Sequence, residues 1–391
     1  NVAIFDVEKT GKAKSLGFIP VGWFPTSVRV SADGQTLFVA NGKGTSSAAN
    51  PRGPFPGSPA PRNLQEYIGG LFQGTVALIA LPVAKKRAEQ FGAWSKKAYT
   101  CSPLDAAASP RGLAARPAGS PVPATVGDPS PIKHVIYVIK ENRTYDQVFG
   151  DEPRGNGRAD LCIFGEKITP NLHKISREFA LLDNTYCAGI LSADGHQWST
   201  TAFATDYMEK SFAGFPRSYP DGMGEDEDDA LAYSPAGFIW DNALKHGKTL
   251  RNYGEFAAPT IRWRDPKKKG SISYLPCYRT WKGESDEVIF SSRAVVPTLI
   301  PHTPTNYVGW DMSVPDQFRA DAFLRELAEF EKRGTFPQLV MICLPNDHTS
   351  GTKPGTPTPA ACERMMLRCS SQARECSMRT RDRLPKPVLS P

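Results

Sequence analysis

The stretch from 132 to 150, IKHVIYVIKENRTYDQVFG, constrains the fold more than any other part of the chain. Its first half, from His134 to Ile139, is a short apolar run rich in Val and Ile, which is typical of a strand buried on both faces. Polar residues then arrive together, and apolar residues at helical spacing follow them. Glu141 and Asn142 are therefore expected between a buried strand and a helix. In open α/β sheets that edge is where ligands bind.

A second stretch repeats this pattern further along the chain. The segment 313–333 has apolar residues on one helical face, and the buried strand QLVMICLP comes after it. Asp347 and His348 lie at the carboxyl end of that strand. Both strands are thus expected to deliver metal-type ligands to one sheet edge, where Glu141 and Asn142 suit a hard divalent cation. The alternative is that each group is a solvated polar turn, and the residues alone leave both possibilities open.

Several long motifs follow one another in a fixed order, namely IKHVIYVIKENRTYDQVFG, LCIFGEKITPN, EFALLDNTY, SADGHQWSTTAFATDY and LPNDHTSGTKPGTPTP. Together they resemble the phosphoesterase family of bacterial phospholipases C and an acid phosphatase, within the alkaline-phosphatase-like superfamily. The resemblance covers residues 131–359. It implies an α/β fold with an alkaline-phosphatase-like core sheet and flanking helices. It also implies hydrolysis of phosphate esters, with a phosphate-ester small molecule or a phospholipid head group as substrate.

The same resemblance implies a set of metal ligands. Glu141 and Asn142 match the Glu-Asn pair that binds the catalytic metal in the family. Asp347 and His348 match a second cluster of Asp and His in the superfamily. The metal is expected to be a divalent ion, and the sequence does not give its identity.

A Ser or Thr nucleophile beside the metal is the usual design of the superfamily. In SADGHQWSTTAFATDY, Asp194 and Gly195 predict a tight turn with a helix starting after it. Ser199 and Thr200 are then candidate nucleophiles at a helix N-terminus, with His196 as a phosphate donor or an acid. The sequence does not decide which hydroxyl attacks, and helix capping without chemistry is the alternative for each.

The first third of the chain has a different pattern. GWFPTSVRVS, ADGQ and TLFVANG resemble a blade of a YVTN-type β-propeller. One blade with parts of its neighbours cannot close a ring, because a propeller needs at least about four blades. We therefore expect residues 1–105 to be a partial propeller of one or two blades. Residues 106–131, rich in Ala and Pro, are expected to be a linker, and 132–359 an incomplete phosphoesterase domain.

The formal net charge of +7 is concentrated in residues 360–391, where six Arg and one Lys face three acids. Because no aromatic and basic groove pattern accompanies this charge, we expect no nucleic-acid partner. No apolar run approaches the roughly 18 residues of a membrane span, so no transmembrane segment is expected. Neither a signal peptide nor a Met opens the chain, which indicates a start inside a longer product. Family members are typically exported, so the intact protein is expected to be periplasmic or extracellular.

Residues 360–391 have neither a buried strand nor a clean helical period. The family carries a helix, a strand ending in two acids and an Asp-His pair in this region, and none of these is present. A shifted reading frame would explain the Arg, Cys and Ser bias. We therefore expect a phosphoesterase crippled by the loss of its C-terminal metal ligands. The alternative is a non-catalytic fragment, or a binding or surface protein that uses the propeller strands.

Overall fold

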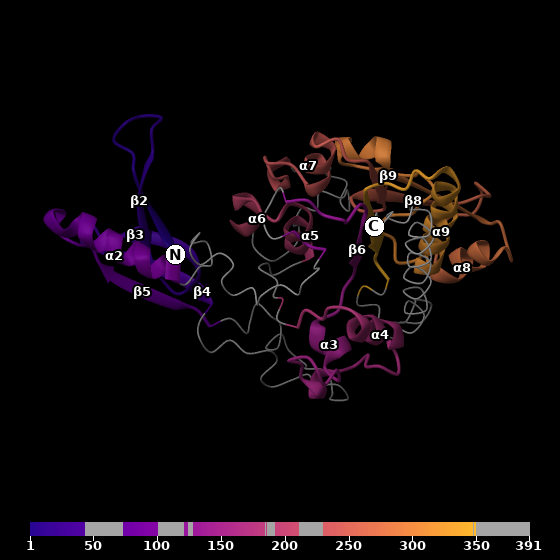
Figure 1. Cartoon of the computed structure of the whole chain (residues 1–391), viewed down its shortest axis with the longest axis horizontal. Coiled ribbons are helices and arrows are strands. Elements are labelled where there is room, and N and C mark those ends of the chain that lie inside the picture. The colour runs from indigo at the N-terminus through magenta and orange to yellow at the C-terminus, as the bar shows by residue number, and fades with distance from the viewer. Residues whose placement is uncertain are drawn as a thin grey trace, which may run out of the picture. The chain divides into compact units, whose positions relative to one another are not determined.

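The computed structural model describes residues 1–43, 73–100, 121–123, 128–183, 185, 192–210, 230–346 and 348 (Figure 1). Contacts divide the chain into two units, 1–129 and 130–391, and this boundary falls inside the expected linker. Much of that linker, and all of 349–391, lies outside the described residues. The described residues form a mixed α/β protein, in agreement with the fold class predicted from the sequence.

The first unit contains two antiparallel sheets. In one of them, β1 (Val2–Asp6) pairs with β2 (Lys14–Ile19). In the other, β4 (Thr36–Lys43) lies between β3 (Trp23–Val30) and β5 (Thr75–Ala80). Half-buried and exposed residues alternate along β1, as expected for a strand with one covered face.

The two sheets of the first unit share a small core, and a helix packs against it. The buried members of this core are Ile19, Leu37 and Val39. A short 3₁₀ helix, η2 (Ala84–Lys86), leads into α2 (Arg87–Thr100), which contacts β2. Ser95 Oγ on α2 accepts a hydrogen bond of 2.9 Å from the backbone N–H of Phe18. The helix is therefore fixed to the edge of the first hairpin.

The second unit is built on a parallel sheet of three strands in the order β6–β10–β7. These strands are β6 (Val135–Lys140), β10 (Leu339–Leu344) and β7 (Leu250–Tyr253). β10 is buried along its whole length, because it has a neighbouring strand on each side. All three strands run parallel, so their carboxyl ends meet at one edge of the sheet.

Alternate residues of β10 enter two separate hydrophobic clusters, as the two-residue period of a strand requires. On one face, Val340 and Ile342 pack with Phe323 of α9 (Asp316–Arg333). On the other face, Met341 packs with a cluster that includes Trp240 of α7 (Ile239–Lys245). Both faces of the central strand are therefore covered, which explains its continuous apolar sequence.

An antiparallel pair of strands and further helical segments complete the described part of the second unit (Figure 1). β8 (Ala257–Trp263) and β9 (Val288–Ala294) form an antiparallel pair. The remaining helical segments are α3 (Tyr145–Phe149), η3 (Ala159–Leu161), α4 (Pro170–Glu178), α5 (Ser192–Thr201), α6 (Asp206–Lys210), η4 (Ala230–Ala232), α8 (Tyr274–Lys282) and η5 (Pro297–His302).

The helix predicted over 313–333 is confirmed as α9, which ends at Gly334 in the left-handed conformation with φ 65°. Within the described part of the chain, no helix is both long enough and apolar enough to cross a membrane.

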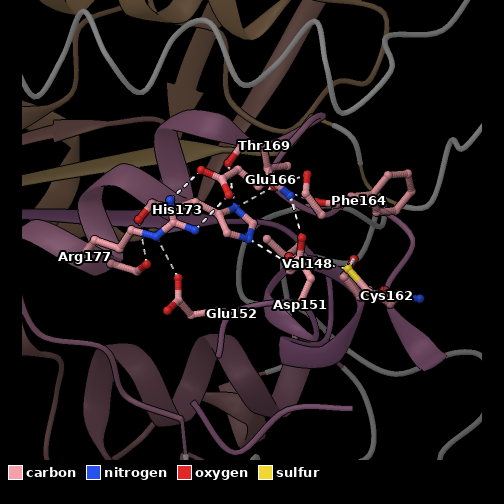
Figure 2. A network of polar contacts seen from close by, with 12 residues as sticks. Val148, Asp151, Glu152, Cys162, Phe164, Glu166, Thr169, His173 and Arg177 are labelled. Atoms are coloured by element: carbon pink, nitrogen blue, oxygen red, sulfur yellow. Dashed lines mark hydrogen bonds and ion pairs between the residues drawn. The ribbon is translucent and has the colours of Figure 1, made fainter. Parts of the chain in front are cut away.

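A polar network fixes the chain that follows α3 (Figure 2). Glu152 is 2% exposed and accepts a hydrogen bond of 3.0 Å from Nε of Arg177 on α4. Arg177 also donates to Glu166 at 2.8 Å. Asp151 contacts Nε2 of the buried His173 at 2.9 Å and accepts the backbone N–H of Glu166 at the same distance. This network ties α4 to the loop that follows α3.

Candidate active site

Two buried carboxylates and a histidine meet at the carboxyl edge of the parallel sheet. Glu141 directly follows β6, Glu255 lies just after β7, and His348 lies beyond the end of β10. The ladder between β6 and β10 extends into the site, because the N–H of Glu141 donates to the carbonyl of Leu344 at 3.2 Å. Glu141 is 7% exposed and Glu255 is 1% exposed. Such acids are seldom buried unless a partner compensates their charge.

That partner is His196 of α5, which bridges the two carboxylates. Its Nε2 lies 2.9 Å from Glu141 Oε1, and its Nδ1 lies 2.8 Å from Glu255 Oε1. Burial by itself lowers the pKa of His196, but the charges and hydrogen bonds of Glu255 and Glu141 outweigh it and raise the pKa well above its ordinary value. Both ring nitrogens therefore carry protons that are donated to carboxylates. The expected role of His196 as a phosphate donor would require one of these bonds to break.

The predicted proximity of Glu141 and His348 is confirmed. His348 Nε2 lies 3.6 Å from Glu141 Oε2, the carboxylate oxygen that His196 does not use. Trp310 covers both histidines, with its ring centroid 5.0 Å from that of His348 and 6.1 Å from that of His196. Asp347, the other ligand expected on this strand, lies outside the described residues.

The donor atoms at this edge are of the type that binds divalent cations. Glu141 Oε2 and Asn142 Oδ1 are buried oxygens without a hydrogen-bond partner among the described residues. Glu141 and Glu255 bring two carboxylates against the single positive charge of His196, and a buried excess of negative charge favours a cation. However, no group of three or more acidic, His or Cys side chains in the described ranges is arranged to hold a metal ion. The described donors by themselves therefore do not form a complete ligand shell.

The helix expected to start after Gly195 starts earlier, so this expectation is wrong. α5 spans Ser192–Thr201, which places Ser199 and Thr200 in its last turns, away from its N-terminus. Both hydroxyls donate to the backbone carbonyl of His196, Ser199 at 3.1 Å and Thr200 at 2.5 Å. Hydrogen bonds of this kind are the ordinary behaviour of Ser and Thr inside a helix. Their proposed role as nucleophiles stays a prediction, but its argument from a helix N-terminus no longer holds.

The hydroxyl at the start of α5 belongs to Ser192, which the sequence argument passed over. Ser192 is four residues before His196, so the two side chains share one face of the helix. His196 contacts Glu141 from that face. The sequence SADG is compatible with a helix N-terminus as well as with a turn, so it could have indicated the start of α5 at Ser192.

Glu255 was also missed, although it follows a third buried strand in the same way that Glu141 follows the first. Together with six other residues it lines a cavity of about 10 Å³, roughly the space of one water molecule. Cys343 is 2% exposed, and this burial raises the pKa of its thiol well above the ordinary value. The lining residues are His196, Gly254, Glu255, Phe256, Ala257, Trp310 and Cys343.

No family model matches the chain, and no curated protein and no solved structure matches it. The functional interpretation therefore depends on the geometry of this sheet edge and on the motifs of the chain.

Proposed function

We propose that the chain derives from a metal-dependent hydrolase of phosphate ester bonds. The observation that carries this proposal is the buried carboxylate of Glu141 at the edge of the sheet, whose Oε2 has no hydrogen-bond partner among the described residues and lies 3.6 Å from His348 Nε2. Asn142 Oδ1, on the next residue, is likewise buried without a hydrogen-bond partner among the described residues. Hard oxygen donors at the carboxyl ends of parallel strands suit a divalent cation. The order of the sequence motifs supports an alkaline-phosphatase-like core for the second unit and a partial propeller for the first.

In this proposal Glu141, Asn142, Asp347 and His348 hold the metal. When bound, a divalent metal neutralises charge on phosphoryl oxygens and lowers the pKa of a nearby hydroxyl. His196 fixes the orientation of Glu141 through its hydrogen bond, which is the usual role of a group behind a metal ligand.

Ser192 is the hydroxyl that best fits the nucleophile. It lies at the N-terminus of α5, the end of a helix that attracts phosphoryl oxygens, and on the same face as His196. Ser199 and Thr200 remain the weaker candidates, because they lie in the last turns of α5, away from its N-terminus.

The proposed substrate is a small phosphate ester or a phospholipid head group, and the intact protein is proposed to act after export. The alternative is a non-catalytic fragment or a binding protein that uses the strands of the first unit. One observation favours the alternative, because the described residues do not assemble three acidic, His or Cys ligands into a metal site.

The test is hydrolysis of p-nitrophenyl phosphate and bis(p-nitrophenyl) phosphate by the purified chain with added Mg²⁺, Mn²⁺, Ca²⁺ or Zn²⁺. Weak metal-dependent turnover that disappears in Glu141→Ala is the expected result, because the described residues supply only part of a ligand set. Glu329→Ala is the matched control, because Glu329 is an exposed carboxylate on α9 that pairs with Lys332. Turnover that survives Glu141→Ala, or that needs no metal, would contradict the proposal.

A further inference from the structure

Arg319, a fully buried side chain on α9, holds a short segment over the active site. Its exposed fraction is 0%, and a guanidinium group has five N–H donors to satisfy. Four of its hydrogen bonds go to backbone carbonyls of the segment 308–314, at 2.7 to 2.9 Å. The fifth goes to Asp316 Oδ1 at 3.1 Å. The accepting carbonyls belong to Val308, Gly309, Asp311 and Val314.

The backbone of this segment is also in close contact with the start of β8. A Cβ atom on Gly309 would lie 2.0 Å from the carbonyl oxygen of Ala257, so only glycine allows this approach. The N–H of Gly309 donates to Ser292 Oγ on β9 at 3.3 Å. The segment is therefore held from α9 on one side and from the β8–β9 pair on the other.

Trp310 lies between two of the carbonyls that Arg319 binds, those of Gly309 and Asp311. Its ring meets the rings of His348 and His196 edge-on, with interplanar angles of 72° and 76°. It also lines the active-site cavity. A half-exposed Trp in this place gives the site a flat apolar wall beside its charged groups.

Arg319 is also linked, through Asp316, to the strand that leads to His348. The N–H of Asp316 donates to Asn346 Oδ1 at 2.8 Å, and Asn346 is fully buried directly after β10. Because Arg319 also binds Asp316, one side chain links the Trp310 segment to the end of β10. The positions of Trp310 and His348 are therefore set by a common support.

We propose that Trp310 contacts the organic group of the ester and that Arg319 is the positioning residue that places Trp310. This inference rests on the proposed phosphoesterase function and adds to it a substrate class. The wall favours esters whose organic group is flat and apolar, such as aryl phosphates, over methyl phosphate.

Kinetics with phenyl phosphate and methyl phosphate test the wall. Trp310→Leu is expected to raise KM for phenyl phosphate about tenfold, the size of a lost aromatic contact, and to leave KM for methyl phosphate unchanged. Arg319→Lys keeps the charge but has only three N–H donors, so it is expected to shift KM in the same direction. Trp281→Phe, on α8, is the tryptophan control, and Arg177→Lys, in the network of Figure 2, is the arginine control. Equal KM changes for both esters would contradict the proposal that Trp310 contacts the organic group.

A second readout does not need turnover. With 5-fluorotryptophan incorporated, the seven Trp residues give seven ¹⁹F resonances, and Trp310→Leu identifies the one from Trp310. We expect phenyl phosphate to shift this resonance and inorganic phosphate to leave it in place. Arg319→Lys is expected to move or broaden it, whereas Arg177→Lys does not.

The two proposals can fail separately. Turnover of phenyl phosphate without a shift of the Trp310 resonance would contradict the contact between Trp310 and the organic group. The proposed phosphoesterase function would not be affected by this result. A shift of that resonance without metal-dependent turnover would contradict the phosphoesterase function. It would support Trp310 as part of a binding surface. An unchanged Trp310 resonance in Arg319→Lys would overturn the positioning role, and Trp310→Leu still tests the wall where Arg319→Lys does not fold.

Discussion

His196 stands between two carboxylates in a buried site, and opposite effects act on its charge. Burial disfavours the imidazolium, whereas Glu255 and Glu141 stabilise it by charge and by hydrogen bonds. The carboxylates dominate, so the pKa of His196 is raised and the ring stays a positive link between two acids. Its two hydrogen bonds therefore hold Glu141 in a fixed orientation, which the proposed metal site requires.

Glu255 is linked to Glu141 through His196, which gives a prediction for Glu255→Gln. The substitution keeps the shape of the side chain but removes the charge that helps to hold the imidazolium, so Glu141 is less firmly oriented. We expect kcat/KM for p-nitrophenyl phosphate to fall about 10- to 100-fold, as for other groups behind a metal ligand. Glu329→Gln, on the exposed side of α9, is the control and should behave as the original chain. Unchanged kcat/KM in Glu255→Gln would show that the bridge has no part in activity.

The position of Ser192 gives a second prediction at this scale. Ser192→Ala is expected to abolish turnover, because it removes the hydroxyl at the start of α5. Ser199→Ala makes the same chemical change near the end of the same helix and is expected to keep most of the activity, since Ser199 lies away from the helix N-terminus and its hydroxyl donates to His196 O. Rates of p-nitrophenol release from both variants decide between them. The reverse result would restore Ser199 as the nucleophile.

Among the elements, those with a continuous local pattern could be predicted from the sequence. The apolar run of β10 and the one-sided apolar face of α9 are strong signals, and both elements are present. The start of α5 was missed because Asp194 and Gly195 are typical of turns, and Gly lowers helix stability by about 1 kcal/mol. Glu255 was missed because β7 has only four residues, and its relation to Glu141 depends on pairing with a strand far along the chain.

The network between α4 and the loop after α3 gives a prediction about pH. The hydrogen bond from Arg154, together with that from Arg177, lowers the pKa of Glu152 in the folded protein. A carboxylate with a lowered pKa stabilises the fold above its unfolded pKa, about 4.3, and this contribution is lost as pH falls through the folded value. We therefore expect Glu152→Gln to lower Tm by several degrees at pH 7.

Thermal unfolding of both proteins between pH 3 and pH 8 tests the sign of this effect. The difference in Tm should stay constant from pH 8 to about pH 5 and shrink below about pH 4. Glu284→Gln, at an exposed carboxylate after α8, is the control and should follow the original chain throughout. A difference that persists undiminished at pH 3 would show that Glu152 stabilises the fold by packing and not by charge.

At the scale of the whole molecule, the proposed active site belongs entirely to the second unit, 130–391. Within the described residues, β6 and β7 each pair with β10 alone, so the parallel sheet has three strands. The family resemblance implies further strands that carry metal-binding acids. Residues 360–391 hold no such pattern and carry six Arg and one Lys against three acids.

The last prediction therefore concerns the chain after Pro359. Glu141, Asn142, Asp347 and His348 supply at most four ligands, and only two of them are acidic, whereas phosphoryl transfer needs the charge on attacking and leaving oxygens to be neutralised. We expect a version whose coding sequence past Pro359 is read in another frame to have a kcat/KM about 100-fold or more above the chain as written. Among the described residues β6 and β7 are the edge strands of the parallel sheet, and added strands would cover such an edge, so the restored version should aggregate less and unfold at a higher temperature. Both proteins are compared with p-nitrophenyl phosphate and bis(p-nitrophenyl) phosphate in the presence of added divalent metal. Robust metal-dependent turnover by the chain as written, lost in Glu141→Ala, would show that residues up to 359 already complete the site.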